Sequence, residues 1–199
     1  VVGDVTDGAL AHTLLRDLRP AVVALNAGAP LAMAPIHEQT WEAFSATWNN
    51  DVKAALLWTR AILKLPLAPG SRVLLGSSGA ALSGSPLSGG YAGAKRMLWL
   101  MAHYANGVAA ELGLGIRFQA LLPLQMVGET AFGRHAAEAY ARRRGVTLEA
   151  FLAGFGKPMS PRQFGEHVVE ILTDAKHAQG TAFGLKGDTG ITSLDTAAP

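Results

Sequence analysis

The sequence contains no cysteine in its 199 residues, which excludes disulfide bonds, thiolate catalysis and cysteine-ligated metal sites. Charged residues make up only 16% and the net charge is +2 at pH 7, so a basic nucleic-acid surface is not expected. No apolar run approaches the ~18 residues that suggest a membrane span, and no signal-peptide pattern opens the chain. We therefore expect a cytoplasmic protein with a hydrophobic core.

Neither the histidines nor the one basic cluster marks a functional site. The six histidines do not show HExxH or similar ligand spacing, so no metal site is expected. The run Arg142-Arg143-Arg144 is interpreted as a solvated helix end whose charge complements the helix dipole.

Short apolar runs alternate with longer helical stretches along the chain. Buried strands are predicted over residues 21–25, 71–75, 116–122 and 181–185, the last of these being the final strand. Helices are predicted over 7–18, 91–112, from Thr40 continuously to about Leu65, and from a capping box at Ser160 to about Leu172. This alternation predicts an α/β fold, a Rossmann-like doubly wound parallel sheet with helices on both faces, in one domain over 1–199.

Residues of chemical interest follow the predicted strands directly. Asn26-Ala27-Gly28, Gly76-Ser77-Ser78 and Pro123 each stand where a strand ends. Ligands of open parallel sheets bind beyond the carboxyl ends of the strands, so these segments are expected to line the binding crevice.

The strongest chemical signal is Tyr91 with Lys95, which share one helix face at i and i+4 spacing. An ammonium beside a phenol is expected to lower the phenol pKa from its usual ~10, so that Tyr91 can exchange a proton with a substrate oxygen. Ser78 could donate a hydrogen bond to that oxygen. Taken alone, the pair could equally be a half-buried tyrosine and a lysine extended to solvent. The buried strand ending in Ser-Ser-Gly and the small-residue loop 80–90 favour the acid–base interpretation.

With these motifs in order, the whole chain resembles the short-chain dehydrogenase/reductase family. By that resemblance Tyr91 gives or takes the proton, Lys95 holds the nicotinamide ribose and lowers the pKa of Tyr91, and Ser78 orients and polarises the substrate carbonyl. The resemblance implies NAD- or NADP-dependent interconversion of a carbonyl and an alcohol on a small molecule. The implied cofactor-binding positions are Asp4, Val5, Asn26, Ala27, Gly28, Tyr91, Lys95, Pro123 and Thr130.

The sequence departs from the family pattern at three places. No G-x-G-x-x-G turn stands between a strand and a helix, so we expect a βαβ unit of ~30 residues or more to precede Val1. Asp51 occupies the catalytic asparagine position; alternatively, Asn50 serves after a one-residue shift and Asp51 is solvated. Leu124 follows Pro123 where the family has glycine, and leucine does not readily adopt a positive φ.

Residues 128–159 correspond to the family's substrate lid. Their aromatic and apolar side chains predict either an apolar substrate pocket or simple packing of the lid: Phe132, Tyr140, Phe151, Phe155 and Met159. The helices from Thr40 and Tyr91 are the family's usual subunit surfaces, so a homodimer or homotetramer is expected, although core packing could also explain their apolar residues (Leu56, Leu57, Trp58, Trp99 and Leu100).

Two rival functions remain open. The chain could be a catalytically inactive relative that uses the fold for binding or assembly, which the missing glycine turn, Asp51 and Leu124 would favour. It could also be a hydrolase in which Lys95 activates Ser78, although no G-x-S-x-G elbow surrounds Ser78.

Overall fold

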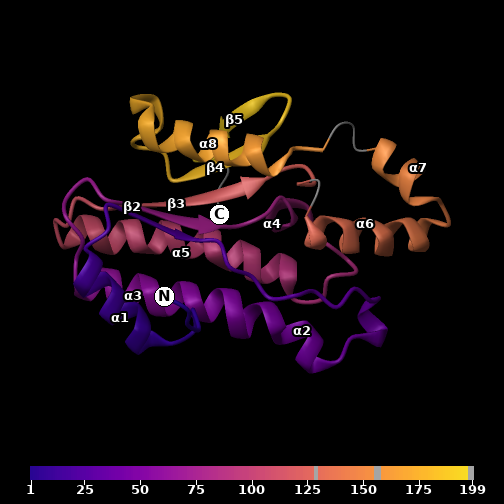
Figure 1. Ribbon diagram of the computed structural model, residues 1–199, viewed down its shortest axis with the longest axis horizontal. Coiled ribbons are helices and arrows are strands. Elements are labelled where there is room, and N and C mark those ends of the chain that lie inside the picture. Colours follow the sequence, from indigo (N-terminus) through magenta and orange to yellow (C-terminus); the bar gives the residue numbers. More distant parts are fainter. Residues whose placement is uncertain (128–129, 155–157, 197–199) are drawn as a thin grey trace.

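The computed structural model describes residues 1–127, 130–154 and 158–196, with a five-stranded sheet at its centre (Figure 1). The strands lie in the order β1 (Val22–Leu25), β2 (Arg72–Gly76), β3 (Arg117–Pro123), β4 (Ala182–Lys186) and β5 (Gly190–Ser193). The first four are parallel, and their carboxyl ends therefore meet at one edge. The predicted α/β fold is confirmed, and a strand forms at each of the four predicted places. The expectation that the first of these strands is buried on both faces was wrong, because Val22 and Ala24 of the edge strand β1 are exposed.

The last strand of the sheet was not predicted, and the expectation that the strand over 181–185 is final was wrong. β5 returns antiparallel to β4, with Leu185 opposite Ile191. The turn between them ends at Gly190, whose φ of +77° is a conformation that glycine adopts without strain. A glycine- and aspartate-rich turn before Ile191 and Thr192 was the available hairpin signal.

Helices cover both faces of the sheet, as predicted. In Figure 1, α1 (Gly8–Leu18), α3 (Lys53–Lys64) and α5 (Tyr91–Glu111) lie on one side and α8 (Pro161–Thr173) on the other. The remaining helices are α2 (Trp41–Thr47), α4 (Ala80–Ser83), α6 (Ala131–Arg144), α7 (Leu148–Ala153), and the single turns η1 (Ile36–Glu38) and η3 (Ala175–His177).

The caps predicted at Thr40 and Ser160 form: Thr40 accepts a hydrogen bond from the first turn of α2, and Ser160 forms both bonds of its capping box with Gln163. Asp7, predicted as the first helical residue, instead caps α1 by accepting from Ala9 N and Leu10 N. The three arginines predicted at a helix end close α6 and are exposed.

One π-helical turn, η2 (Trp48–Val52), interrupts the helix predicted to be continuous from Thr40 to Leu65. The sequence there has neither proline nor glycine, so nothing local marked the interruption. Such turns insert one extra residue and occur often at functional sites. Here the inserted turn contains the buried Asp51.

Apolar side chains pack on both faces of the central strands. Val73, Phe118 and Leu122 belong to the cluster that includes Ile62 of α3 and Ala102 of α5. On the other face, a second cluster joins residues of β2, β3 and β4 to Ile171 of α8. The central strands β2, β3 and β4 are therefore buried on both sides, which holds their carboxyl ends in fixed positions.

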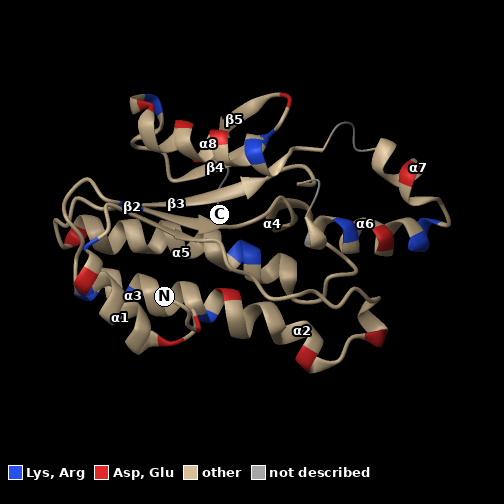
Figure 2. Cartoon of the chain, viewed as in Figure 1, with Lys and Arg blue, Asp and Glu red and all other residues tan. Residues whose placement is uncertain are grey.

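Charged residues are dispersed over the helices and loops rather than gathered in a stripe of one sign in the view of Figure 2. Among the described residues, no helix combines the length and the apolarity needed to cross a bilayer.

Candidate active site

The end of β2 and the first turns of α5 are tied together at two buried points. The Ser77 hydroxyl donates to the carbonyl oxygen of Lys95 at 2.7 Å, and the Lys95 ammonium donates to the carbonyl oxygen of Gly76 at 2.9 Å. These bonds place the next residue of the strand end, Ser78, beside the start of α5. Sequence reasoning missed the anchoring role of Ser77.

Ser78, Tyr91 and Lys95 come together as the sequence predicted. The Ser78 hydroxyl lies near enough to the Tyr91 hydroxyl to act on its pKa. The same hydroxyl of Ser78 accepts from the backbone N–H of Ala80 at 3.2 Å, which fixes its position. The Lys95 Nζ lies 5.6 Å from the centre of the Tyr91 ring. A serine hydroxyl and a phenol therefore converge at one point, with an ammonium nearby.

The pKa of Tyr91 moves in the opposite direction to the one expected. Burial raises it, the hydrogen bond from Ser78 opposes that rise, and the negative charge of Asp51 adds to it. The expected net lowering of the Tyr91 pKa was wrong, because the phenol is only 9% exposed and burial dominates, while the ammonium of Lys95 is paired with a carboxylate.

That carboxylate is Asp51, which is 5% exposed. Its Oδ2 lies 3.0 Å from the Lys95 Nζ, and its Oδ1 accepts from the backbone N–H of Ala29 at 2.9 Å. A Cβ atom on Gly28 would lie 3.2 Å from Asp51 Oδ2, so the glycine lets the loop after β1 approach the carboxylate. The alternative assignment was wrong: Asp51 is not solvated, whereas Asn50 is exposed and donates to the carbonyl of Ala46.

Gly90 fixes the position at which α5 begins, and neither it nor its partner Trp48 was predicted as a site residue. The Gly90 N–H donates to the Phe44 carbonyl at 3.2 Å, and the Trp48 indole N–H donates to the Gly90 carbonyl at 3.0 Å. A Cβ atom on Gly90 would overlap the Phe44 carbonyl oxygen. Helix α2 thus holds the residue directly before Tyr91.

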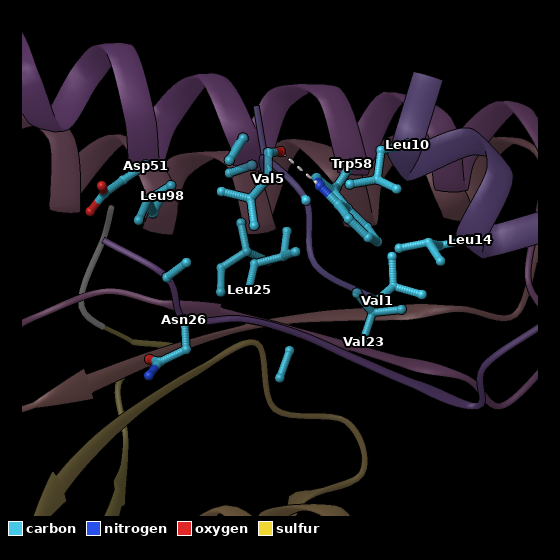
Figure 3. A pocket seen from close by; sticks show the side chains of 16 residues that line it. Val1, Val5, Leu10, Leu14, Val23, Leu25, Asn26, Asp51, Trp58 and Leu98 are labelled. Atoms are coloured by element: carbon cyan, nitrogen blue, oxygen red, sulfur yellow. Dashed lines mark hydrogen bonds between the residues drawn. The ribbon is translucent and has the colours of Figure 1, made fainter. Parts of the chain in front are cut away.

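A cavity of about 250 Å³ opens between the loop after β1 and helices α3 and α5. Figure 3 shows Asp51 and Leu98 at one end of it and Asn26 below them. Val5 and Ala27 also line the cavity, and the Val5 carbonyl accepts from the Trp58 indole at 3.0 Å. The predicted cofactor positions Val5, Asn26 and Ala27 therefore share one cavity with Asp51.

Asp4 does not line this cavity, and its carboxylate is used locally. It accepts from the backbone N–H of Thr6 at 2.7 Å and from the Thr6 hydroxyl at 2.8 Å. These two bonds, the backbone one first, hold the pKa of Asp4 below its usual range.

The segment after β3 accommodates leucine at the position where the family has glycine. Leu124 does not have a positive φ. The Cδ1 atom of Leu124 lies 2.6 Å from the point that a Cβ atom on Gly184 would occupy. The Pro123 carbonyl accepts from the Gly79 N–H at 2.8 Å, which joins this segment to the strand end that carries Ser78. The Thr130 hydroxyl caps α6 by accepting from Gly133 N and donates to the Val127 carbonyl, both at 3.0 Å.

The described aromatic residues of the lid pack against protein rather than around an open pocket. The Tyr140 hydroxyl bonds to Ser85 at 2.8 Å, and its ring stacks on the buried Phe151 at 6.2 Å between centroids. Met159 is buried among core residues beneath α8. Gly128 and Phe155 lie outside the described residues, as does the side chain of Phe132. For Tyr140, Phe151 and Met159, the packing alternative therefore holds.

Comparison with known proteins gives matches at the level of structure. Neither a protein-family model nor a curated protein matches the sequence. A short chain dehydrogenase family protein from Francisella tularensis superposes with a TM-score of 0.77 at 18% identity, covering 100% of this chain and 81% of that one. Sorbitol-6-phosphate 2-dehydrogenase from Erwinia amylovora gives 0.78 at 19% identity, covering 93% and 76%. NAD⁺-bound xylitol dehydrogenase gives 0.77 at 18% identity, covering 94% and 77%. The chain has the fold of the short-chain dehydrogenases.

Proposed function

We propose that this chain is an NAD- or NADP-dependent oxidoreductase that interconverts a carbonyl and an alcohol on a small molecule. The observation that carries the proposal is the position of the Lys95 ammonium, 5.6 Å from the centre of the Tyr91 ring, with the Ser78 hydroxyl near enough to act on the pKa of the phenol. These groups lie at the carboxyl edge of a parallel sheet, where ligands of this architecture bind.

The roles of these side chains follow from their geometry. Tyr91 is the one acidic O–H of the group, so it protonates a carbonyl oxygen or, as phenolate, accepts the alcohol proton. Ser78 stabilises negative charge developing on the same oxygen, an effect typically worth ~3 kcal/mol. Lys95 holds positive charge beside both and is itself positioned by Gly76 and Asp51.

The side chains present suit the nicotinamide end of a dinucleotide. Two of the three N–H donors of Lys95 are directed at Gly76 O and Asp51 Oδ2, and the third can bond a ribose hydroxyl. Val5, Asn26 and Ala27 form the wall of the adjoining cavity. When bound, the cofactor would supply or accept the hydride. Two proteins of this fold, a xylitol dehydrogenase and a 3-ketoacyl-(acyl-carrier-protein) reductase, contain NAD⁺ and NADH respectively.

The contacts of Lys95 do not favour the hydrolase alternative. A lysine that activates a serine must accept its proton, whereas the Lys95 ammonium donates to Gly76 and is paired with Asp51.

The proposal is tested by measuring carbonyl-dependent oxidation of NADH and NADPH over a panel of small aldehydes and ketones. Tyr91→Phe should lower kcat by about 100-fold or more, because it removes the proton donor. The matched control is Tyr104→Phe, since Tyr104 lies on the same helix but is 56% exposed. Turnover that survives in Tyr91→Phe would assign the chemistry elsewhere. Cofactor binding without turnover on the panel would favour the inactive binding relative.

A homo-oligomer assembled through α3 and α5 is part of the same proposal. Leu56 on α3 and Val108 on α5 are large apolar side chains exposed to solvent. Trp99, by contrast, is 3% exposed and belongs to the core, so it does not contribute to a subunit surface. Sedimentation of Leu56→Asp against the unaltered chain tests the assembly: a smaller species is expected, and an unchanged one would contradict it.

A further inference from the structure

The most unusual feature of the site is a buried ion pair one step away from the phenol. The side chains of Asp51 and Lys95 are 3% and 10% exposed, and their charged atoms are 3.0 Å apart. Removing two charges from water is costly unless both are paired and hydrogen-bonded. Here both conditions hold, because Ala29 N–H donates to Asp51 and Lys95 donates to Gly76 O.

The bonds of the pair come from different parts of the fold, which fixes both partners. Asp51 stands on the π-helical turn η2, whereas Lys95 stands one helical turn after Tyr91 on α5. Their further partners, Ala29 and Gly76, lie at the ends of β1 and β2. Neither partner can leave the other without breaking a bond to the backbone.

Few other charges act on Tyr91. Among the described residues, the other buried ionisable side chain is His177, which packs on Phe183 near α8. The charged residues nearest to Asp51 along the adjoining helices, Glu42 and Lys53, are exposed, and Arg96, next to Lys95 on α5, lies over the Trp99 ring at 4.7 Å. The strand end that faces the phenol contributes the uncharged Ser78. After burial, the negative charge of Asp51 is what raises the pKa of the phenol, and Asp51 is paired with Lys95.

We propose that Asp51 is a positioning residue that pairs with Lys95 and keeps the Tyr91 phenol protonated, so that the site delivers a proton more readily than it removes one. The inference rests on the proposed function and adds the preferred direction of its proton transfer. Asp51 acts in two ways: it offsets the positive charge of Lys95, and its own negative charge disfavours the phenolate form of Tyr91. Burial of Tyr91 and the charge of Asp51 both raise the pKa of the phenol, which agrees with this role.

The consequence concerns rates in the two directions. In reduction the carbonyl carbon gains a hydride from reduced nicotinamide, the carbonyl oxygen takes the Tyr91 proton, and the phenolate regains a proton from solvent. Oxidation needs the phenolate at the start. With the phenol kept neutral, reduction should run at full rate at neutral pH and fall as pH rises through the pKa of Tyr91. Oxidation should increase over that same interval.

The test is a direct titration of Tyr91 in the full chain, followed by NMR of isotope-labelled tyrosine Cζ. The chain has three tyrosines, and Tyr91→Phe assigns the signal. Asp51→Asn should move the Tyr91 midpoint to lower pH, because it removes the negative charge that raises the pKa of the phenol. Lys95→Met should move it to higher pH. Loss of packing alone would move both variants in the same direction, so the opposite signs distinguish charge from structure.

Asp51→Glu serves as the rescue variant, because it restores the carboxylate. In this variant the Tyr91 midpoint should return toward that of the unaltered chain. Midpoints that do not move in Asp51→Asn, or that move in the same direction in Asp51→Asn and Lys95→Met, overturn the inference. Because the titration needs no turnover, its result is independent of the proposed function. If the midpoints shift in opposite directions but the chain shows no reductase activity, the role of Asp51 stands and the proposed function fails. If the chain is active but the midpoints do not shift, the proposed function stands and the role of Asp51 fails.

Discussion

Gly90→Ala should destabilise the protein although it adds one methyl group outside the main core. The new Cβ would overlap the carbonyl oxygen of Phe44 and approach the Trp48 indole to 3.1 Å. The Phe44 carbonyl belongs to α2 and accepts the Gly90 N–H, so relieving the overlap means separating α2 from the start of α5. Overpacking of this kind costs about 1–3 kcal/mol of unfolding free energy.

Denaturant unfolding measures this loss, and Gly107→Ala is the matched control. Gly107 lies in the interior of the same helix and is exposed, with no atom within 4 Å of the point that a Cβ would occupy. Alanine there should stabilise the protein by up to about 1 kcal/mol, through helix propensity alone. Opposite signs for the two substitutions are expected. Equal effects would refute the inference that the contact of Gly90 with α2 fixes the start of α5.

Three further substitutions test individual contacts by denaturant unfolding. Ser77→Ala removes the buried hydrogen bond to the Lys95 carbonyl and should lower the free energy of unfolding by about 1–2 kcal/mol. It should also lower kcat, because α5 is then held less firmly against β2. An unchanged free energy of unfolding would contradict the anchoring role of Ser77. Ser160→Ala removes the cap of α8 and should cost about 1 kcal/mol; an unchanged free energy of unfolding would be evidence against the cap. Burial raises the pKa of Asp195, but hydrogen bonds to the carboxylate outweigh burial and leave the pKa below its usual value. The stabilisation from Asp195 is therefore present above the ordinary aspartate pKa and is lost as the pH falls through the lowered pKa of Asp195. Asp195→Asn should lower the free energy of unfolding by up to about 1 kcal/mol at neutral pH and by progressively less in acid. A loss that does not depend on pH would contradict this.

The strands and most helices could be predicted because their signals are local. The run from Ala21 to Leu25 is apolar throughout and ends at Asn26-Ala27-Gly28, and Ser160 is followed by proline and then Gln163. Each pattern is complete within a few residues. β5 had a local signal as well, in the turn that ends at Gly190, but it was too short to be recognised beside β4.

The residues that join the site together could not be predicted in the same way. The i, i+4 spacing was enough to pair Tyr91 with Lys95, but Asp51 reaches Lys95 through a π-helical turn that no residue type marks. Without that contact, Lys95 was expected to lower the pKa of Tyr91. The sign of the shift depends on burial and on a distant carboxylate, and both are properties of the folded chain.

Deuterium transfer tests the central claim most directly. The chain would be given a reduced nicotinamide that carries deuterium at the transferable position, together with a carbonyl on which it turns over, and the alcohol analysed by mass spectrometry. We expect one deuterium on the carbinol carbon and at least about 100-fold less product in Tyr91→Phe. Product that carries only solvent hydrogen, or equal yields from the two proteins, would contradict hydride transfer assisted by Tyr91.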